Sequence, residues 1–61
     1  MKFNLKTLRL IKGINQQKAS EMLNVSISTI SSWENGKTYP DAMEIKRIEQ
    51  LYDTKFEDIL F

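Results

Sequence analysis

The 61-residue chain contains neither cysteine nor histidine, so a hydrophobic core alone has to hold it folded. Disulfides and structural zinc, the usual supports of very small domains, are therefore excluded, as are thiol nucleophiles and imidazole bases. A chain this short buries only about 60% of the surface that it exposes when unfolded. We expect a single domain over residues 1–61, with no metal or small-molecule cofactor and no enzymatic activity.

The composition is that of a folded domain rather than a disordered or membrane-embedded one. Hydrophobic residues make up 41% of the chain and charged residues 28%, which is too apolar for intrinsic disorder. No apolar run approaches the roughly 20 residues of a membrane span, and no signal-peptide core follows Met1. The sequence thus predicts a cytoplasmic protein that does not contact membranes.

The formal net charge of +1 conceals a difference between the two ends of the chain. Residues 1–37 carry six basic and two acidic side chains, whereas residues 38–61 carry three basic and six acidic ones. If the two segments form different surfaces, the molecule has a basic face suited to a polyanion and an acidic face. The alternative is a mixed, solvated surface.

Helix-ending and helix-capping residues divide the chain into short helical segments. Gly13 follows a cation in the last turn of one segment, Asn15 and Ser26 are suitable N-caps, and Asp41 with Glu44 has the layout of a capping box. No segment alternates as a strand would. We therefore predict an all-α fold of five short helices, over residues 4–12, 16–23, 27–35, 42–52 and a last turn or two at 56–61.

The apolar positions within these segments recur at helical spacing and predict the core. The residues that we expect to face inward are Leu5, Leu8, Ala19, Met22, Leu23, Ile30, Trp33, Ile45, Ile48, Leu51, Tyr52, Phe56, Ile59 and Leu60.

Residues 16–36, QQKASEMLNVSISTISSWENG, have the layout of a helix-turn-helix motif. An eight-residue helix leads through a three-residue turn, with Asn24 at the position that needs a left-handed backbone, into a second helix that ends at Gly36. In such motifs the second helix enters the DNA major groove and the first crosses the backbone. Spacing alone is also compatible with an ordinary helical hairpin.

The stretches LKTLRLIKGINQQ, NVSISTISSWENGK and YDTKFEDIL closely resemble the Xre family, the Cro and repressor helix-turn-helix proteins of phages and bacteria. The resemblance covers nearly the whole chain, from Leu5 to Leu60. It implies a five-helix, lambda-repressor-like domain that binds double-stranded operator DNA sequence-specifically as a weak dimer. It further implies a transcriptional regulator, of the repressor or Cro-like kind, whether the chain is a whole protein or the N-terminal domain of a longer one.

In this family the second helix of the motif reads the bases through its outward face. The resemblance assigns that role to Ile27, Ser28, Ser31 and Ser32, and it places Gln17 close to the groove edge. Serine can bond to several base edges, whereas Ile27 can offer only apolar contact, for example to a thymine methyl group. The alternative for the serines is that they fill an exposed helix surface. The operator sequence cannot be read from these residues.

Phosphate contacts are expected at both ends of the motif. The positive end of the helix dipole and free N–H groups at residues 16 and 17 suit a phosphate. The residues assigned to phosphate contact are Asn15, Gln16, Ser26, Asn35, Lys37 and Thr38. Alternatively, Asn15 serves only as a cap and Lys37 only as a solubilising charge.

The resemblance also implies an ion pair between Arg9 and Glu34 that ties the first helix to the third. Two departures from the family pattern bear on the motif. Ser20 stands where alanine is usual, so its hydroxyl needs a carbonyl, expected four residues back. Asn24 replaces the more common glycine.

Exposed apolar residues near the chain ends have two interpretations. Phe3, Leu10 and Phe61 could form a satellite cluster that covers both ends. Alternatively they mark a dimer contact, for which the resemblance suggests Phe56, Asp58 and Phe61. A second function class also stays open, in which the fold is a protein-interaction module such as an antitoxin or regulatory cofactor.

Overall fold

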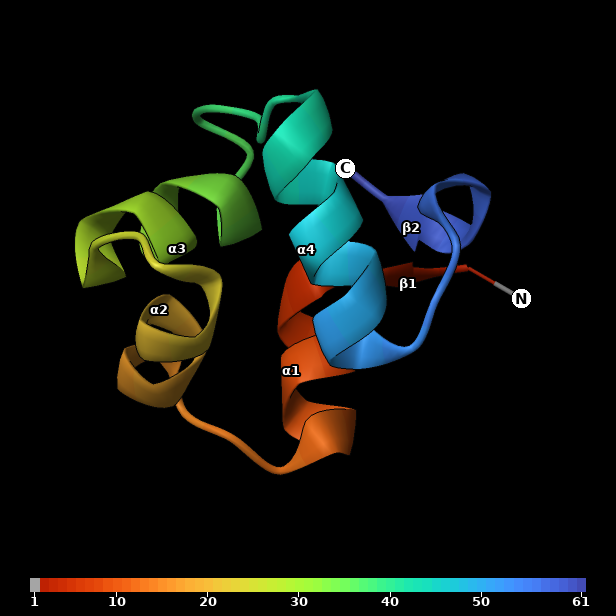
Figure 1. Ribbon diagram of the computed structural model, residues 1–61. Helices are drawn as coiled ribbons and strands as arrows, with labels where there is room; N and C mark the ends of the chain where they lie inside the picture. The colour runs from red at the N-terminus through yellow and green to blue at the C-terminus, as the bar shows by residue number, and fades with distance from the viewer. Residues whose placement is uncertain (1) are drawn as a thin grey trace.

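The computed structural model describes residues 2–61 and contains four α-helices around one core (Figure 1). They are α1 (Leu5–Lys12), α2 (Gln16–Leu23), α3 (Ile27–Glu34) and α4 (Ala42–Tyr52). The predicted all-helical architecture is confirmed over these four helices, whose ends agree with the sequence-based limits to within one residue. The remaining elements are the 3-10 turn η1 (Phe56–Asp58) and the two-residue strands β1 (Phe3–Asn4) and β2 (Ile59–Leu60).

Side-chain caps explain where the helices begin. Asn4, Asn15, Ser26 and Asp41 each have an extended backbone, and each side chain accepts a hydrogen bond from the backbone N–H three residues later. At α4 the cap is reciprocal. The Glu44 N–H donates to Asp41 Oδ1 at 2.8 Å, and the Asp41 N–H donates to Glu44 Oε1 at 2.9 Å. The predicted capping box is therefore present.

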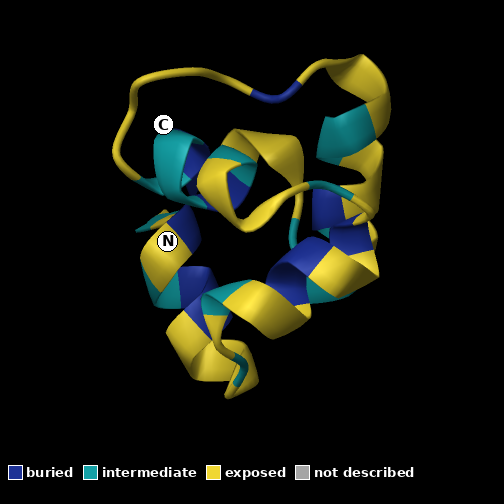
Figure 2. Ribbon diagram, turned by 90° about the vertical axis from the view of Figure 1, so that its left-hand side faces the viewer, coloured by how far each residue is buried: buried dark blue, intermediate teal, exposed yellow. Residues whose placement is uncertain are grey.

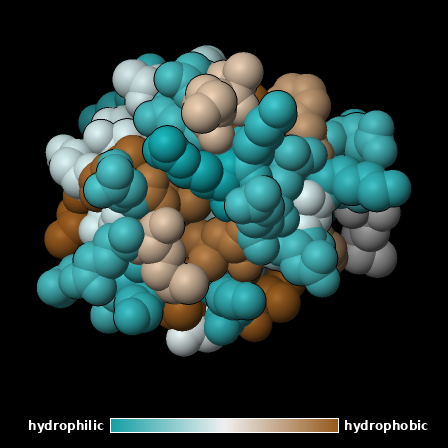
Figure 3. Space-filling view, in the orientation of Figure 1, coloured by the Kyte–Doolittle hydropathy of each residue, from teal (hydrophilic) through white to brown (hydrophobic). Residues whose placement is uncertain are grey.

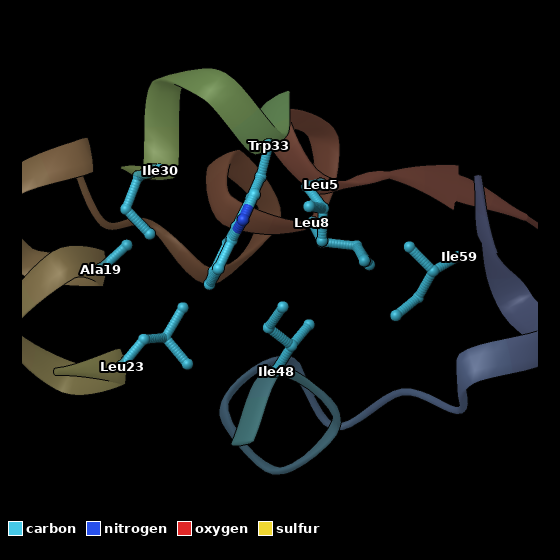
Figure 4. Close-up of a cluster of buried hydrophobic side chains, with 8 residues drawn as sticks. All are labelled: Leu5, Leu8, Ala19, Leu23, Ile30, Trp33, Ile48 and Ile59. Atoms are coloured by element: carbon cyan, nitrogen blue, oxygen red, sulfur yellow. The ribbon is translucent and has the colours of Figure 1, made fainter. Parts of the chain in front are cut away.

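The core consists of side chains from all four helices and β2 (Figure 4). Its buried members are Leu5, Leu8, Ala19, Leu23, Ile30, Trp33, Ile48 and Ile59. Figure 2 shows the result from another side, with the buried parts of the helices turned towards the centre and most exposed parts outside. Ile45, Leu51 and Tyr52 are only partly buried, because a short helix at the edge of a small core covers few residues fully.

The prediction of a fifth helix over residues 56–61 is wrong. Only a 3-10 turn forms, and the chain then becomes extended and pairs in parallel with β1, Phe3 opposite Ile59 and Asn4 opposite Leu60. Lys55, the residue before η1, provides no side-chain cap, and only the Phe56 N–H is held from elsewhere, by Glu49 Oε2 at 2.7 Å. The final residues gain backbone hydrogen bonds by pairing with β1, whereas a helix of so few residues is marginal. Of the three tail residues expected inside, only Ile59 is buried, while Phe56 and Leu60 are about half exposed.

Two details of the inward positions also differ from prediction. Met22 is 49% exposed, and Ser20 is buried instead, because α2 presents Ala19, Ser20 and Leu23 to the core. The Ser20 hydroxyl donates to the carbonyl of Gln17 at 2.7 Å, three residues back rather than four.

The strand pairing also decides how the charged segments are arranged. Because residues 3–4 lie beside residues 59–60, the basic N-terminal and acidic C-terminal segments meet at the same edge of the molecule (Figure 1). Within residues 2–61, no helix combines the length and the apolar character that crossing a membrane requires.

Candidate nucleic-acid interface

The turn between α2 and α3 has the backbone geometry that the motif requires. Asn24 adopts the left-handed conformation, with φ 58° and ψ 45°, and ends α2. The N–H of the next residue, Val25, then donates to the Ser20 carbonyl at 3.0 Å. These bonds satisfy carbonyls at the end of α2 and direct the chain into α3. The prediction of a left-handed turn at Asn24 is confirmed.

Helix α3 has one buried face and one that is open to solvent. Ile30 and Trp33 are 3% and 6% exposed and fix the helix to the core, as predicted. On the other side, Ile27 and Ser28 are exposed. The remaining two candidate base readers, Ser31 and Ser32, are half-buried. The structure therefore gathers all four on α3, with the N-terminal pair the more accessible.

Serine hydroxyl groups make local hydrogen bonds at each end of α3. Ser26 Oγ caps the helix by accepting from the Thr29 N–H at 3.1 Å and lies 3.0 Å from Ser28 Oγ. At the other end, the Asn35 side-chain amide donates to Ser31 Oγ at 3.2 Å. Because Ser31 accepts this bond, its own O–H remains free to donate to an acceptor on a base edge.

The candidate phosphate contacts lie at three helix ends: the start of α2, the start of α3, where Ser26 is the cap, and the end of α3. At the start of α2, Asn15 Oδ1 accepts from the Lys18 N–H at 2.7 Å, while the N–H groups of the first two helical residues have no acceptor within the helix. After α3, the Lys37 N–H donates to the Ser32 carbonyl at 2.9 Å. This bond holds the segment 35–38 close to the helix end, and its residues are exposed.

The predicted ion pair between α1 and α3 is present. Arg9 Nε donates to Glu34 Oε2 at 2.7 Å, and Arg9 Nη2 donates to Oε1 at 3.2 Å, which gives a two-point contact. The side chains are 9% and 5% exposed. Arg9 Nη1 also donates to the Ile14 carbonyl at 3.1 Å. One guanidinium thus joins α1, the loop before α2 and the end of α3.

Sequence reasoning missed a further member of this network. The Gln16 side-chain amide donates to Glu34 Oε1 at 3.1 Å. Nothing in the sequence connects residues 18 positions apart, and the family resemblance assigns Gln16 to phosphate. The side chain is engaged inside the protein, whereas the backbone N–H of Gln16 is left for a phosphate, so the predicted contact stays a prediction.

The network changes the proton affinity of two groups. Hydrogen bonding to Glu34, reinforced by its negative charge, raises the pKa of Arg9 above its ordinary value, which keeps the ion pair charged. Burial, together with the charge of Glu34, raises the pKa of Tyr52 to about 12, although the Arg9 charge opposes this shift. Tyr52 lies on α4, so the electrostatic influence of the pair reaches a fourth element.

The charge around α3 is modest. The helix itself carries no basic residue, and the charge of Arg9 is compensated by Glu34. Lys18, within the motif on α2, and Lys37, directly after the motif, are exposed and carry positive charge. Figure 3 shows a surface on which hydrophobic patches lie among hydrophilic side chains. The candidate interface thus presents short side chains and few positive charges.

Two of the three predicted dimer residues, Phe56 and Phe61, lie at a separate place, an apolar groove beside α4. The groove has a volume of about 240 Å³ and is lined by Tyr39, Pro40, Ile45, Phe56 and Phe61. The Phe61 ring lies 6.2 Å from that of Tyr39 and 5.9 Å from that of Phe56. We call these five residues the aromatic groove. Asp58 is half-buried in η1, and Tyr39 and Pro40 are members that sequence reasoning did not find.

Phe3, Leu10 and Phe61 do not form the satellite cluster that was one of the two interpretations of the sequence. Phe3 packs against the main core, Leu10 is 59% exposed on α1, and Phe61 joins the aromatic groove.

Comparison with known proteins agrees with this geometry. The helix-turn-helix family matches the chain over residues 5–59, and the chain belongs to this family, in its Cro/C1-type branch. A curated relative, the HTH-type transcriptional activator BcrR of Enterococcus faecalis, is 37% identical over 62 residues. The match covers 98% of this chain but 30% of the activator, so the chain spans less than a third of that relative's length. No solved structure gives a significant match.

Proposed function

We propose that the chain is a sequence-specific double-stranded DNA-binding domain of a transcriptional regulator. The observation that carries the proposal is the orientation of α3, whose Ile30 and Trp33 are buried while Ile27 and Ser28 are exposed next to a capped, left-handed turn. A helix held in this way is free to enter a major groove. Family membership over residues 5–59 supports the same function.

In this proposal the bases are read by short side chains. Ile27 contacts apolar groups such as thymine methyls, and Ser28, Ser31 and Ser32 donate to or accept from base edges, with Gln17 at the groove edge. Phosphates are held by the start of α2, by the N-cap of α3 and by the segment after α3. The residues proposed for that role are Asn15, Gln16, Ser26, Asn35, Lys37 and Thr38.

Both directions of regulation begin with the same event, occupation of an operator. The family resemblance suggests a repressor or Cro-like role, whereas the curated relative BcrR is named as an activator. We propose operator binding as the activity of this domain. Repression or activation then depends on where the operator lies relative to the promoter.

The domain is proposed to bind as a dimer of two copies that meet at the aromatic groove. Phe56 and Phe61 are 52% and 45% exposed, which is unusual for large aromatic side chains unless a partner covers them. Two copies related by a two-fold axis would place their α3 helices in successive major grooves. The half-sites would then lie about 34 to 36 Å apart on one side of the duplex.

Selection from a random double-stranded DNA pool followed by footprinting tests the proposed function. We expect enrichment of a two-fold symmetric site, with affinity falling steeply as salt rises because each neutralised phosphate releases counterions. Failure to enrich any sequence at low salt would contradict it. That result would favour the alternative, a protein-interaction module such as an antitoxin, whose apolar contact through the aromatic groove should be nearly insensitive to salt.

The dimer has a separate test. Sedimentation of Phe61→Ser, compared with Leu10→Ser as a control of similar exposure outside the groove, should show that only the groove variant loses self-association. On DNA, the same variant should bind a single half-site as well as the unaltered protein does while losing the advantage of the full site. A monomer at high concentration and on the full site would contradict the dimer.

A further inference from the structure

The contact between Gln16 and Glu34 joins the two places where the proposed interface meets phosphates. Gln16 is the first residue of α2, and Glu34 is the last residue of α3. The Gln16 amide and the Arg9 guanidinium both donate to the same oxygen, Glu34 Oε1, at 3.1 and 3.2 Å. A single carboxylate therefore links the start of one helix to the end of the other.

The burial of Glu34 makes this link costly to break. Its side chain is 5% exposed, so water offers the carboxylate little replacement for a lost donor. If the Gln16 amide turned outward to a phosphate, Oε1 would keep only its longer bond to Arg9. The backbone N–H of Gln16, in contrast, needs no rearrangement, because it has no acceptor within the helix.

From this geometry we infer that Gln16 is a positioning residue: its side chain, acting through Glu34, sets the distance between the two phosphate-binding helix ends. Its backbone N–H, rather than its amide, is the group left for DNA. This inference rests on the proposed DNA-binding function for its consequence, but the contact itself can be tested without DNA.

The test without DNA compares Gln16→Glu with Gln17→Glu. The first turn of α2 contains no acidic residue, so a glutamate there should improve the interaction with the helix dipole. Gln17 is exposed, and Gln17→Glu should leave the unfolding temperature unchanged or raise it. Gln16→Glu instead places a second carboxylate against Glu34, and we expect its folding equilibrium constant to fall about tenfold at pH 7.

The pH profile separates this repulsion from a general loss of packing. Repulsion between the new carboxylate and that of Glu34, which faces Arg9 and Tyr52, is present at pH 7 and is lost as the pH falls towards 4 and the carboxylates take up protons. The difference between Gln16→Glu and the unaltered protein should therefore shrink on acidification. Equal stability of the two glutamate variants, or a difference that does not change with pH, would overturn the inference.

The test with DNA uses the site obtained by selection, under conditions in which circular dichroism shows each variant to be folded. Gln16→Met, which keeps the length of the side chain but removes the amide, should weaken binding about tenfold. One phosphate at a time is then replaced by a neutral methylphosphonate. The loss caused by Gln16→Met should persist at least in part at every position, because the side chain acts on both helix ends and its amide has no phosphate partner.

Lys37→Met is the matched control. If Lys37 contacts a phosphate, its loss should disappear at one methylphosphonate position and the salt slope should fall by about one. The same disappearance for Gln16→Met would show a direct amide contact and overturn the inference. If the chain binds no DNA, the proposed function fails, and the two glutamate variants still decide whether Gln16 acts through Glu34.

Discussion

The motif region and the C-terminal segment are held in place by different means. Residues 5–37 combine buried apolar residues with the Arg9, Gln16 and Glu34 network, and nearly every turn is fixed by a side-chain or left-handed cap. Residues 53–61 have one buried side chain, Ile59, and a two-residue strand pairing, while their aromatic rings remain half exposed. The first region is thus fixed by polar contacts of defined geometry, whereas the second gathers its exposed rings in the aromatic groove.

The proposed DNA binding and self-association would explain this difference. A surface that recognises DNA has to keep two phosphate-binding ends and a reading helix at fixed distances, which favours charged contacts with defined geometry. A surface that associates weakly with a second copy needs accessible apolar area rather than internal order. Substitutions in the two regions should therefore differ in what they damage, folding in one and association in the other.

The largest expected effect is in the motif region. Arg9→Ala or Glu34→Ala should each lower the free energy of unfolding by about 3 to 5 kcal/mol, because each leaves a buried charge without its partner. The double variant should lose clearly less than the sum, which urea denaturation of all four proteins can measure. Purely additive losses below about 1 kcal/mol would mean that the pair behaves like an exposed one.

In the C-terminal segment, substitution of the one buried residue should cost much more stability than substitution of an exposed one. Ile59→Ala should cost about 2 to 4 kcal/mol, since Ile59 is 6% exposed and its loss leaves a cavity beside β1. Phe56→Ala should cost about 1 kcal/mol or less, because its ring is 52% exposed. Denaturation at low protein concentration, where dimers do not contribute, provides the measurement. Similar losses for both would show that the aromatic groove is part of the folding core.

The motif region was largely predictable from sequence because its signals are local. Asn15, Asn24, Ser26 and Gly13 define helix ends through the conformation of one or two residues, and the buried positions of α3 follow from its period. The C-terminal segment was not predictable in the same way. Its conformation depends on β1, more than 50 residues away in the chain, and a helical spacing of apolar residues there gave the wrong structure.

The candidate site shows the same limit at the level of single contacts. The family resemblance supplied the Arg9–Glu34 pair, but the bond from Gln16 depends on the packing angle between α2 and α3, which no spacing in the sequence encodes. Tyr39 and Pro40 were likewise missed as groove members, because they lie in the α3–α4 loop and reach Phe61 only in the folded chain.

Tyr52 connects the charged network to α4, and its raised pKa leads us to expect a loss of stability at alkaline pH. Because burial raises its folded-state pKa to about 12 from the ordinary 10.0, the unfolded chain ionises first as the pH rises. Stability contributed by the neutral phenol is complete below pH 10 and is lost between pH 10 and 12. Partial solvent access reduces the loss to about 1 to 2 kcal/mol. Urea denaturation at several pH values should show this fall, and Tyr52→Phe should remove it.

The smallest expected effect concerns a backbone feature that both regions share. Asn24 after α2 and Asp53 after α4 are non-glycine residues in the left-handed conformation, with φ 58° and 49°. Asp53 also places a negative charge at the negative end of the α4 dipole. Asp53→Gly should therefore stabilise the protein by about 0.5 to 1 kcal/mol. The substitution relieves the strain of the left-handed backbone in the folded state, and the more flexible unfolded chain offsets part of this gain.

Two further substitutions separate the backbone and charge contributions in this last comparison. Asp53→Asn removes only the charge and should stabilise by about 0.3 to 0.5 kcal/mol. Gly13→Ala should destabilise by about 1 kcal/mol, since Gly13 has φ 79° and the added methyl group meets no atom within 4 Å, so backbone strain alone opposes it. Thermal unfolding of the three variants measures the signs. A destabilised Asp53→Gly would show that the Asp53 side chain holds the C-terminal segment in a way that its backbone conformation does not reveal.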